Sequence, residues 1–301
     1  MAIIPSAVLE LGAELVGNYF VSLSRSFDSN WVLLGSDKQF WSGPGSREPP
    51  VPPFHFQVYV YDGYVWHVPV KIGPTEKRYH FAQTLPGGKW LLVEARARVG
   101  QSANADVFDG SGQLVASWFL GDGIEHLQVS TAGDIWVGYF DEGVYGGGQL
   151  EHSGLVCFGQ DGDPKLRFWQ GIAEPNGLPP IDDLYALNVC RNGDAWCCYY
   201  SDFPLVRLKD LQLQEAWREF PKKPVRAFAV NGARLLMVPA YMKSGPLSIC
   251  DLSTNTITEE QLTDSSGRTI AFDFVVGRDV TLGFVSLNHF ENPVLYQVDF
   301  T

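Results

Sequence analysis

Residues 130–148, STAGDIWVGYFDEGVYGGG, decide the fold because copies of their first part recur along the chain. The segment has a tight Ala-Gly-Asp turn, then an apolar run with a tryptophan, and then an acidic, glycine-rich loop. Residues 188–202, NVCRNGDAWCCYYSD, repeat the turn, the tryptophan and the apolar run. Further copies, of which the last two lack the tryptophan, occur at 24–37, 83–96, 229–241 and 275–286. The sequence therefore contains six copies of one strand–turn–strand unit.

A second hairpin-like stretch follows each of the first five copies. These stretches are residues 56–70, 105–119, 154–169, 204–217 and 246–262. Units of four strands that recur at intervals of this size predict the blades of a β-propeller. Because no long segment has the 3.6-residue apolar period of a helix, we expect little helix.

The sixth unit has only three strand-like runs. Residues 7–16, AVLELGAELV, precede the first full unit and belong to no blade, so we expect them to supply the missing strand. Sharing the last blade between both ends of the chain would remove an open sheet edge. We therefore predict an all-β protein, a six-bladed β-propeller forming a single domain over residues 1–301. The alternative is seven blades, with the extra strands in the proline-rich segment 35–55, where proline disfavours central strands.

Residues 177–208 carry a family resemblance. They combine Gly-Leu-Pro, a strand, an Asn-Gly turn and an apolar run with a tryptophan. This order resembles the repeat of two-component-regulator-type propellers, and the whole chain more broadly resembles the NHL, SMP-30 and YncE-like propeller superfamily. The resemblance implies the ring architecture. In that family the repeats form ligand-sensing or scaffolding domains joined to a signalling module, and we identify no such module in this sequence.

Composition narrows the classes of partner and the location. The net charge of −12 argues against nucleic acid and anionic membranes as partners, and it favours a cationic partner. No stretch approaches 18 uncharged apolar residues, and the N-terminus lacks the basic segment of a signal peptide. The five cysteines form no C-x-x-C pair, so we expect buried, reduced thiols. Together these features predict a cytoplasmic protein.

The loops that precede the inner strands share one rim of a propeller with the loops that join the second and third strands. In this chain both sets are rich in acidic and aromatic residues, and loops on a rigid scaffold commonly carry function. Each acid could instead have a structural role, accepting backbone hydrogen bonds or solvating the rim. We predict a binding rim formed by Arg78, Asp122, Glu125, His126, Asp141, Glu142, Tyr145, His152, Asp182, Asp183, Tyr200, Asp202 and His289.

The residue types on this rim favour binding over catalysis. Aromatic and arginine side chains dominate interface energetics, so we expect a protein or small-molecule ligand, preferably a basic one, and no cofactor. A neutralising partner of a toxin is one form of such a binder. The sequence leaves open whether the protein is an enzyme.

The alternative function is a metal-dependent hydrolase similar to the six-bladed lactonases of the SMP-30 kind. These enzymes hold a divalent cation in the channel through Glu, Asn and Asp side chains. Glu125, Asn188 and Asp273 would then be the ligands of one Ca²⁺ or Mg²⁺, although the entry motif of those lactonases is missing. A lyase-type acid–base pair of Glu125 and His126 is disfavoured, because neighbours on a regular strand point to opposite faces.

Overall fold

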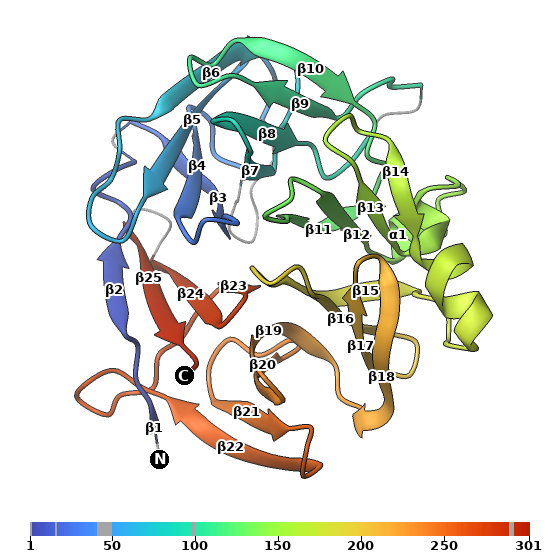
Figure 1. Cartoon of the computed structure of the whole chain (residues 1–301). Helices are drawn as coiled ribbons and strands as arrows, with labels where there is room; N and C mark the ends of the chain where they lie inside the picture. Colours follow the sequence, from blue (N-terminus) through green and yellow to red (C-terminus); the bar gives the residue numbers. More distant parts are fainter. Residues whose placement is uncertain (1, 16, 41–49, 98–99, 289–291) are drawn as a thin grey trace.

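The computed structural model describes residues 2–15, 17–40, 50–97, 100–288 and 292–301. These residues form six sheets arranged around a central channel, which is a six-bladed β-propeller (Figure 1). The predicted fold is therefore confirmed. The described residues contain no seventh sheet, so the seven-bladed alternative is wrong.

Blades 1 to 3 each contain four strands, in the following order from the channel outwards. Blade 1 consists of β3 (Tyr19–Arg25), β4 (Trp31–Ser36), β5 (Phe54–Tyr61) and β6 (Val70–Thr75). Blade 2 consists of β7 (Phe81–Leu85), β8 (Lys89–Val93), β9 (Ala105–Phe108) and β10 (Leu114–Trp118). Blade 3 consists of β11 (Ile124–Val129), β12 (Ile135–Tyr139), β13 (Leu155–Phe158) and β14 (Pro164–Arg167).

Blades 4 to 6 continue the ring in the same order. Blade 4 consists of β15 (Asp183–Val189), β16 (Ala195–Tyr200), β17 (Pro204–Lys209) and β18 (Gln212–Pro221). Blade 5 contains β19 (Val225–Asn231), β20 (Arg234–Pro239), β21 (Pro246–Asp251) and β22 (Thr256–Leu262). Blade 6 contains β23 (Phe274–Arg278), β24 (Thr281–Asn288) and β25 (Asn292–Asp299).

The N-terminal segment closes the ring, as Figure 1 shows at the blue and red ends of the chain. Strand β2 (Ala7–Glu10) pairs antiparallel with β25 and is the outer strand of blade 6. This confirms the strand predicted in residues 7–16, although only its first four residues pair. Strand β1 (Ala2–Ile3) pairs in parallel with β22 of blade 5, which the sequence did not predict.

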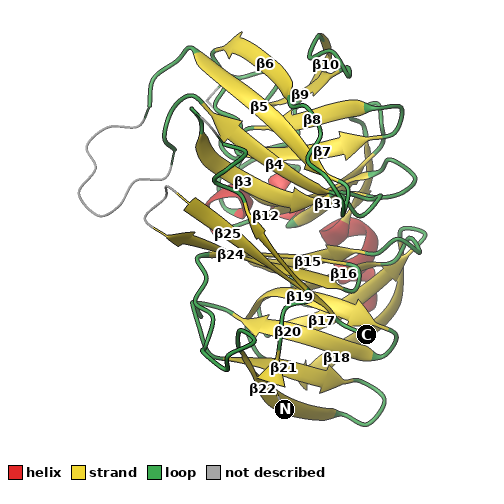
Figure 2. Ribbon diagram, turned by 90° about the vertical axis from the view of Figure 1, so that its left-hand side faces the viewer, coloured by secondary structure: helices red, strands yellow, loops and turns green. Residues whose placement is uncertain are grey.

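Helical turns are few and short, as expected (Figure 2). They are α1 (Asp141–Val144), η1 (Glu151–Ser153), η2 (Trp169–Ala173) and η3 (Glu174–Asn176). Within the described part of the chain, no helix has the length and apolar character needed to cross a membrane.

One predicted hairpin differs from the structure. The second strand of the hairpin predicted at 56–70 begins only at Val70 and runs to Thr75. The residues before it form a longer loop, in which Tyr61 bridges to Trp66. The side chain of Asp62 accepts hydrogen bonds from the backbone N–H groups of Tyr64 and Val65, and these bonds fix the turn in place of a tight Asp-Gly turn.

The apolar core is divided into six clusters, and each cluster lies between two neighbouring blades. All five cysteines are buried and unpaired within this core, as predicted. Because the blades pack face to face around the whole ring, the inner strands and the loops at their ends are held on a rigid frame.

Candidate functional site

Four of the six inner strands contain a β-bulge near their first residues. The extra residue is Val21 in β3, Glu125 in β11, Tyr185 in β15 and Arg226 in β19. A bulge interrupts the alternation of side chains and can bring two successive residues to one face. Glu125 and His126 both line the central cavity, as do their strand neighbours Ile124, Leu127 and Gln128. That Glu125 and His126 point to opposite faces therefore stays a prediction.

The central channel contains a cavity of about 470 Å³, a size typical of small-ligand pockets. All four bulged residues line it. Most of its wall is apolar and comes from the inner strands, with Phe20, Leu23, Phe81, Leu127, Leu187 and Phe274 among the lining residues.

Two polar side chains cross the channel near the turn rim, the rim opposite the loops. Gln128 of β11 donates from Nε2 to the carbonyl oxygen of Gly277 in β23, at 2.9 Å. Arg278, which is 2% exposed, donates from Nη2 to the carbonyl oxygen of Val129, at 2.6 Å. Both bonds join blade 3 to blade 6 across the ring. The cavity therefore faces the loop rim, where the bulged residues lie.

The three predicted metal ligands do not form a ligand set. Asn188 lies towards the turn rim, where its Oδ1 accepts a hydrogen bond from the Asp279 amide at 2.6 Å. Glu125 lies at the other end of the channel. Asp273 accepts a backbone amide hydrogen bond, and its Oδ1 is 3.5 Å from the Nζ of Lys243. No group of three His, Cys, Asp or Glu residues in the described ranges could hold a metal ion. These side chains do not fit the divalent cation of the hydrolase alternative.

Glu125 and Arg226 carry opposite charges at the entrance of the cavity. Burial raises the pKa of Glu125, and the nearby Arg226 opposes this shift. Burial lowers the pKa of Arg226, whose guanidinium donates to the carbonyl oxygens of Met242 and Asp273, each at 3.1 Å. In the described part of the chain, no ion pair within 4.0 Å joins Glu125 to a cation. Glu125 is exposed to solvent through the channel, so the surrounding protein removes only part of the hydration of its carboxylate.

Two histidines in the cavity wall are neutral at physiological pH. Burial lowers the pKa of His80 and of His126 to about 4. The Nδ1 of His80 accepts a hydrogen bond from the Ala95 amide at 3.1 Å, so its proton lies on Nε2. The Nε2 of His126 has no hydrogen-bond partner among the described residues. His80 was not among the predicted site residues, although its position just before β7 in the repeat could have indicated it.

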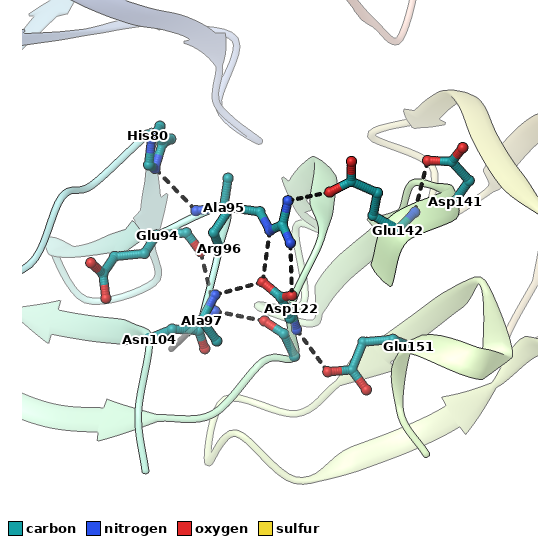
Figure 3. A network of polar contacts seen from close by, with 11 residues as sticks. His80, Glu94, Ala95, Arg96, Ala97, Asn104, Asp122, Asp141, Glu142 and Glu151 are labelled. Carbon is teal, nitrogen blue, oxygen red and sulfur yellow. Dashed lines mark hydrogen bonds and ion pairs between the residues drawn. The ribbon is translucent and has the colours of Figure 1, made fainter. Parts of the chain in front are cut away.

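Arg96 joins blades 2 and 3 on the loop rim (Figure 3). Its Nε is 3.1 Å from Oδ1 of Asp122, and its Nη1 is 2.5 Å from Oε2 of Glu142. Asp122 also accepts a hydrogen bond from the Ala97 amide at 2.6 Å, and its own amide donates to Glu151 at 2.7 Å. The predicted rim residues Asp122 and Glu142 thus share one cation, which the sequence analysis did not identify, and they hold neighbouring loops together.

Four other rim acids have no such cation. Asp141, Asp182, Asp183 and Asp202 lie more than 4.0 Å from every Lys or Arg side-chain nitrogen in the described residues. Asp182 instead accepts a hydrogen bond from Tyr145 Oη at 2.5 Å, which raises the pKa of Tyr145. We name Asp141, Glu142, Asp182, Asp183 and Asp202 together the acidic rim.

Asp183 is the most perturbed member of the acidic rim. Burial, with the negative charges of Asp141 and Glu125 adding to it, raises the pKa of Asp183 to about 6. Asp141 belongs to α1 of blade 3, whereas Asp183 begins β15 of blade 4. The structure therefore brings acids from two neighbouring blades together at the entrance of the cavity.

Aromatic side chains lie next to the acidic rim. The hydroxyl oxygens of Tyr185 and Tyr241 are 2.6 Å apart, and the ring of Phe203 lies edge-on to Tyr185 at 5.4 Å. The rings of Phe203 and Tyr200 are 5.6 Å apart. Tyr241 is 83% exposed and Tyr200 is 49% exposed. We name Tyr185, Tyr200, Phe203 and Tyr241 the aromatic cluster. Of these residues, the prediction named Tyr200 alone.

The remaining predicted residues lie outside this arrangement. The guanidinium of Arg78 donates to the carbonyl oxygen of Phe40 at 3.3 Å and lies over the phenyl ring of Phe40, 4.7 Å from its centre. The backbone amide of Arg78 donates to the side chain of Glu94. Arg78 is therefore part of the packing between blades. His152 is exposed in η1 and does not line the cavity. His289 lies outside the described residues.

Comparisons with known proteins agree with the fold. The YxzG family model matches residues 155–289, which is less than half of the 301 residues. No curated protein gives a significant match.

Several solved structures resemble the whole ring. A chain of the mitotic checkpoint complex has a TM-score of 0.53 and 9% identity, covering 98% of this chain and 96% of that chain. A streptogramin B lyase has a TM-score of 0.51 and 12% identity, and the match covers 98% of this chain and 87% of that chain. Hsv2 of Kluyveromyces lactis has a TM-score of 0.51 and 10% identity, and the match covers 89% of this chain and 70% of that chain. At such identities these similarities show the fold alone, so the predicted resemblance to propeller proteins is confirmed as architecture.

Proposed function

We propose that the protein binds a cationic segment of a partner protein on its loop rim, over blades 3 to 5. The acidic rim is the observation that carries this proposal. Four of its five acids have no lysine or arginine partner among the described residues, and burial disfavours the charge of one of them, Asp183. A cationic segment would supply the missing countercharge. The net charge of −12 would steer such a partner towards the protein.

The aromatic cluster supports the same face as a protein-binding surface. Tyrosines are enriched at the centre of interfaces because they combine apolar area with a polar tip. Asp202, Phe203 and Tyr241 adopt positive φ angles of 65°, 51° and 64°, which non-glycine residues rarely adopt. Such strained positions persist where the surrounding structure fixes them, so these loops are ordered before a partner arrives. Binding would then cost little conformational entropy.

The hydrolase alternative receives no comparable support. Its proposed ligands lie at both ends of the channel, and Asn188 and Asp273 already use their side-chain oxygens in protein hydrogen bonds. We further propose the cytoplasm as the location of the protein, which the five buried and unpaired cysteines support.

Fluorescence anisotropy with labelled peptides tests the proposal. The probes are short Gly/Ser/Tyr peptides that contain no arginine, a few arginines or many. We compare the wild type with the double variant Asp141→Asn/Asp202→Asn and with the control Glu10→Gln/Glu215→Gln, whose residues lie exposed on outer strands β2 and β18. Both variants have the same net charge.

We expect affinity to rise with arginine content and to fall with added salt. The rim variant should bind the arginine-rich peptides about five- to tenfold more weakly, since each exposed charge pair contributes up to about 1 kcal/mol. The control should resemble the wild type. Equal weakening in both variants would mean that the attraction depends on net charge alone, and the proposed rim would be wrong.

A further inference from the structure

The cavity opens in the middle of the face that carries the acidic rim and the aromatic cluster. The hydroxyl of Tyr185, one of its bulged residues, lies 2.6 Å from that of Tyr241 in the aromatic cluster. The negative charge of Glu125, another bulged residue, adds to the raised pKa of Asp183 in the acidic rim. A polypeptide bound on the rim would therefore pass the entrance of the cavity. Because Gln128 and Arg278 cross the other end, a side chain that enters would be enclosed.

Negative charge exceeds positive charge at this entrance. The unpaired charged residues described there are Glu125, Asp183, Asp141 and Arg226. Arg96 pairs with two carboxylates, and Lys243 pairs with Asp273 beside Arg226. Arg25 also lines the cavity, but it ends β3 at the turn rim, where its guanidinium lies 4.6 Å from the centre of the Trp31 ring. Glu125 has no hydrogen-bond or ion-pair partner within the described ranges. Arg226 offsets the desolvation of the Glu125 carboxylate only in part, since the pKa of Glu125 is still raised. The three acids at the entrance therefore outnumber its one unpaired cation, Arg226.

Deeper in the cavity, two buried polar atoms also lack partners. Gln83 is 1% exposed and donates from Nε2 to the carbonyl oxygen of Leu127 at 3.2 Å, but its Oε1 accepts no hydrogen bond from the described residues. The Nε2 atom of His126 also has no hydrogen-bond partner among the described residues. Both residues line the cavity. A buried acceptor without a donor is unfavourable, so a ligand that brings N–H groups would be stabilised there.

We infer that the cavity receives one arginine side chain of the partner protein, whose aliphatic stem passes the entrance and whose guanidinium lies inside, between the carboxylate of Glu125 and the unpartnered Oε1 of Gln83. Arginine fits better than lysine for two reasons. Its planar head has five N–H donors, which can serve carboxylates and an amide oxygen together. Its stem is apolar, as is most of the lining. This inference rests on the proposed function, because the arginine belongs to the cationic segment bound on the rim.

Butylguanidine, a mimic of the arginine side chain, tests the cavity without the partner. Binding is measured by isothermal titration calorimetry, with butanol as the neutral probe of similar length. The key variant is Glu125→Gln, which keeps the shape of the side chain and removes its charge. The matched control is Glu215→Gln on β18. Far-UV circular dichroism and a thermal melt verify that each variant is folded.

We expect butylguanidine to bind the wild type and the Glu215→Gln control equally, and to bind Glu125→Gln about tenfold more weakly. Butanol should bind none of them measurably. Butylguanidine should also displace the arginine-rich peptides. The result that overturns the inference is binding that is unchanged in Glu125→Gln, or no displacement of the peptides.

The two proposals fail in different ways. If the arginine-rich peptides bind the acidic rim but butylguanidine neither binds nor competes, the arginine pocket is wrong and the rim function stands. If butylguanidine binds in a Glu125-dependent way but the peptides do not bind, the proposed function is wrong, and with it the assignment of the cavity to a partner's side chain.

Discussion

The charge of Asp183 would favour the proposed binding of a cationic segment, but the same charge lowers the stability of the folded protein. Burial, together with Asp141 and Glu125, raises its pKa from 3.8 to about 6. Near pH 7 the Asp183 carboxyl is ionised in the folded protein although its surroundings disfavour the charge, and this lowers the free energy of unfolding. As the pH falls through 6 towards 4, the folded state takes up the proton before the unfolded state does, and the loss of stability disappears.

The variant Asp183→Asn should be more stable than the wild type at neutral pH. We expect its free energy of unfolding to rise by about 1–2 kcal/mol near pH 7, less than the ~3 kcal/mol of the full shift, because solvent screens the partly exposed carboxylate. Near pH 4 the gain should vanish, since Asp183 is then protonated in the folded state. Urea unfolding at both pH values measures the difference, with Glu215→Gln as the control. A gain of equal size at both pH values would contradict the raised pKa.

At the scale of single strands, the sequence predicted the hairpins well and the bulges not at all. Period-two alternation and glycine turns identify the strands because each pattern is local. A bulge depends on how a strand pairs with its neighbour, and nothing in Ile-Glu-His at 124–126 marks Glu125 as an extra residue. The convergence of Glu125 with Arg226 and Tyr185 in one cavity therefore emerged only from the structure. The metal assignment to Asn188 failed for a related reason, because spacing along a strand does not show which end of the channel a side chain occupies.

Packing between strands of neighbouring blades makes a second prediction. Near the end of β12, a Cβ added to Gly138 would lie 1.9 Å from Cδ2 of Leu184 in β15. We expect Gly138→Ala to lower the free energy of unfolding by about 1–3 kcal/mol, because the core cannot accept the added methyl group without moving. Leu184 precedes the bulged Tyr185, so the arginine-rich peptides should also bind more weakly.

Gly110→Ala is the matched control for this substitution. A Cβ at Gly110 would meet only the carbonyl oxygen of Gly88, at an ordinary 3.5 Å. Thermal unfolding of the three proteins measures the effect. If the two variants melt at the same temperature, close packing at Gly138 does not constrain the position of β15.

At the scale of the whole molecule, the ring could be predicted because the sequence contains six copies of the repeat. Six copies fix the number of blades, and the incomplete sixth unit indicates closure by the N-terminal segment. The two-residue strand β1 could not be predicted, since it is too short to carry a pattern. The rim could be predicted only in outline. Its loops were identified from the repeat, but the division into paired acids at Arg96 and unpaired acids around Asp183 depends on contacts between blades.

Closure of the ring makes the last prediction. Besides the pairing of β2 with β25, Trp31 of blade 1 packs into blade 6 where Gly283 leaves room for it, and its Nε1 donates to Gln297 at 2.8 Å. Deleting residues 2–10 removes β1 and β2 and exposes the edge of β25, an edge that can pair with other chains. We expect this deletion to lower the melting temperature by about 10 °C and to cause association, visible by size-exclusion chromatography.

Deleting residues 2–4 alone is the control, because it removes β1 and leaves the sheet of blade 6 complete. This shorter deletion should change the melting temperature little. A synthetic peptide of residues 5–12 should bind the longer deletion variant and restore its melting temperature, since an exposed strand edge accepts an added strand through main-chain hydrogen bonds. If the longer deletion variant is as stable and monomeric as the shorter one, the contacts of Trp31 are enough to close the ring. Strand β2 would then have no role in holding the blades around the central cavity.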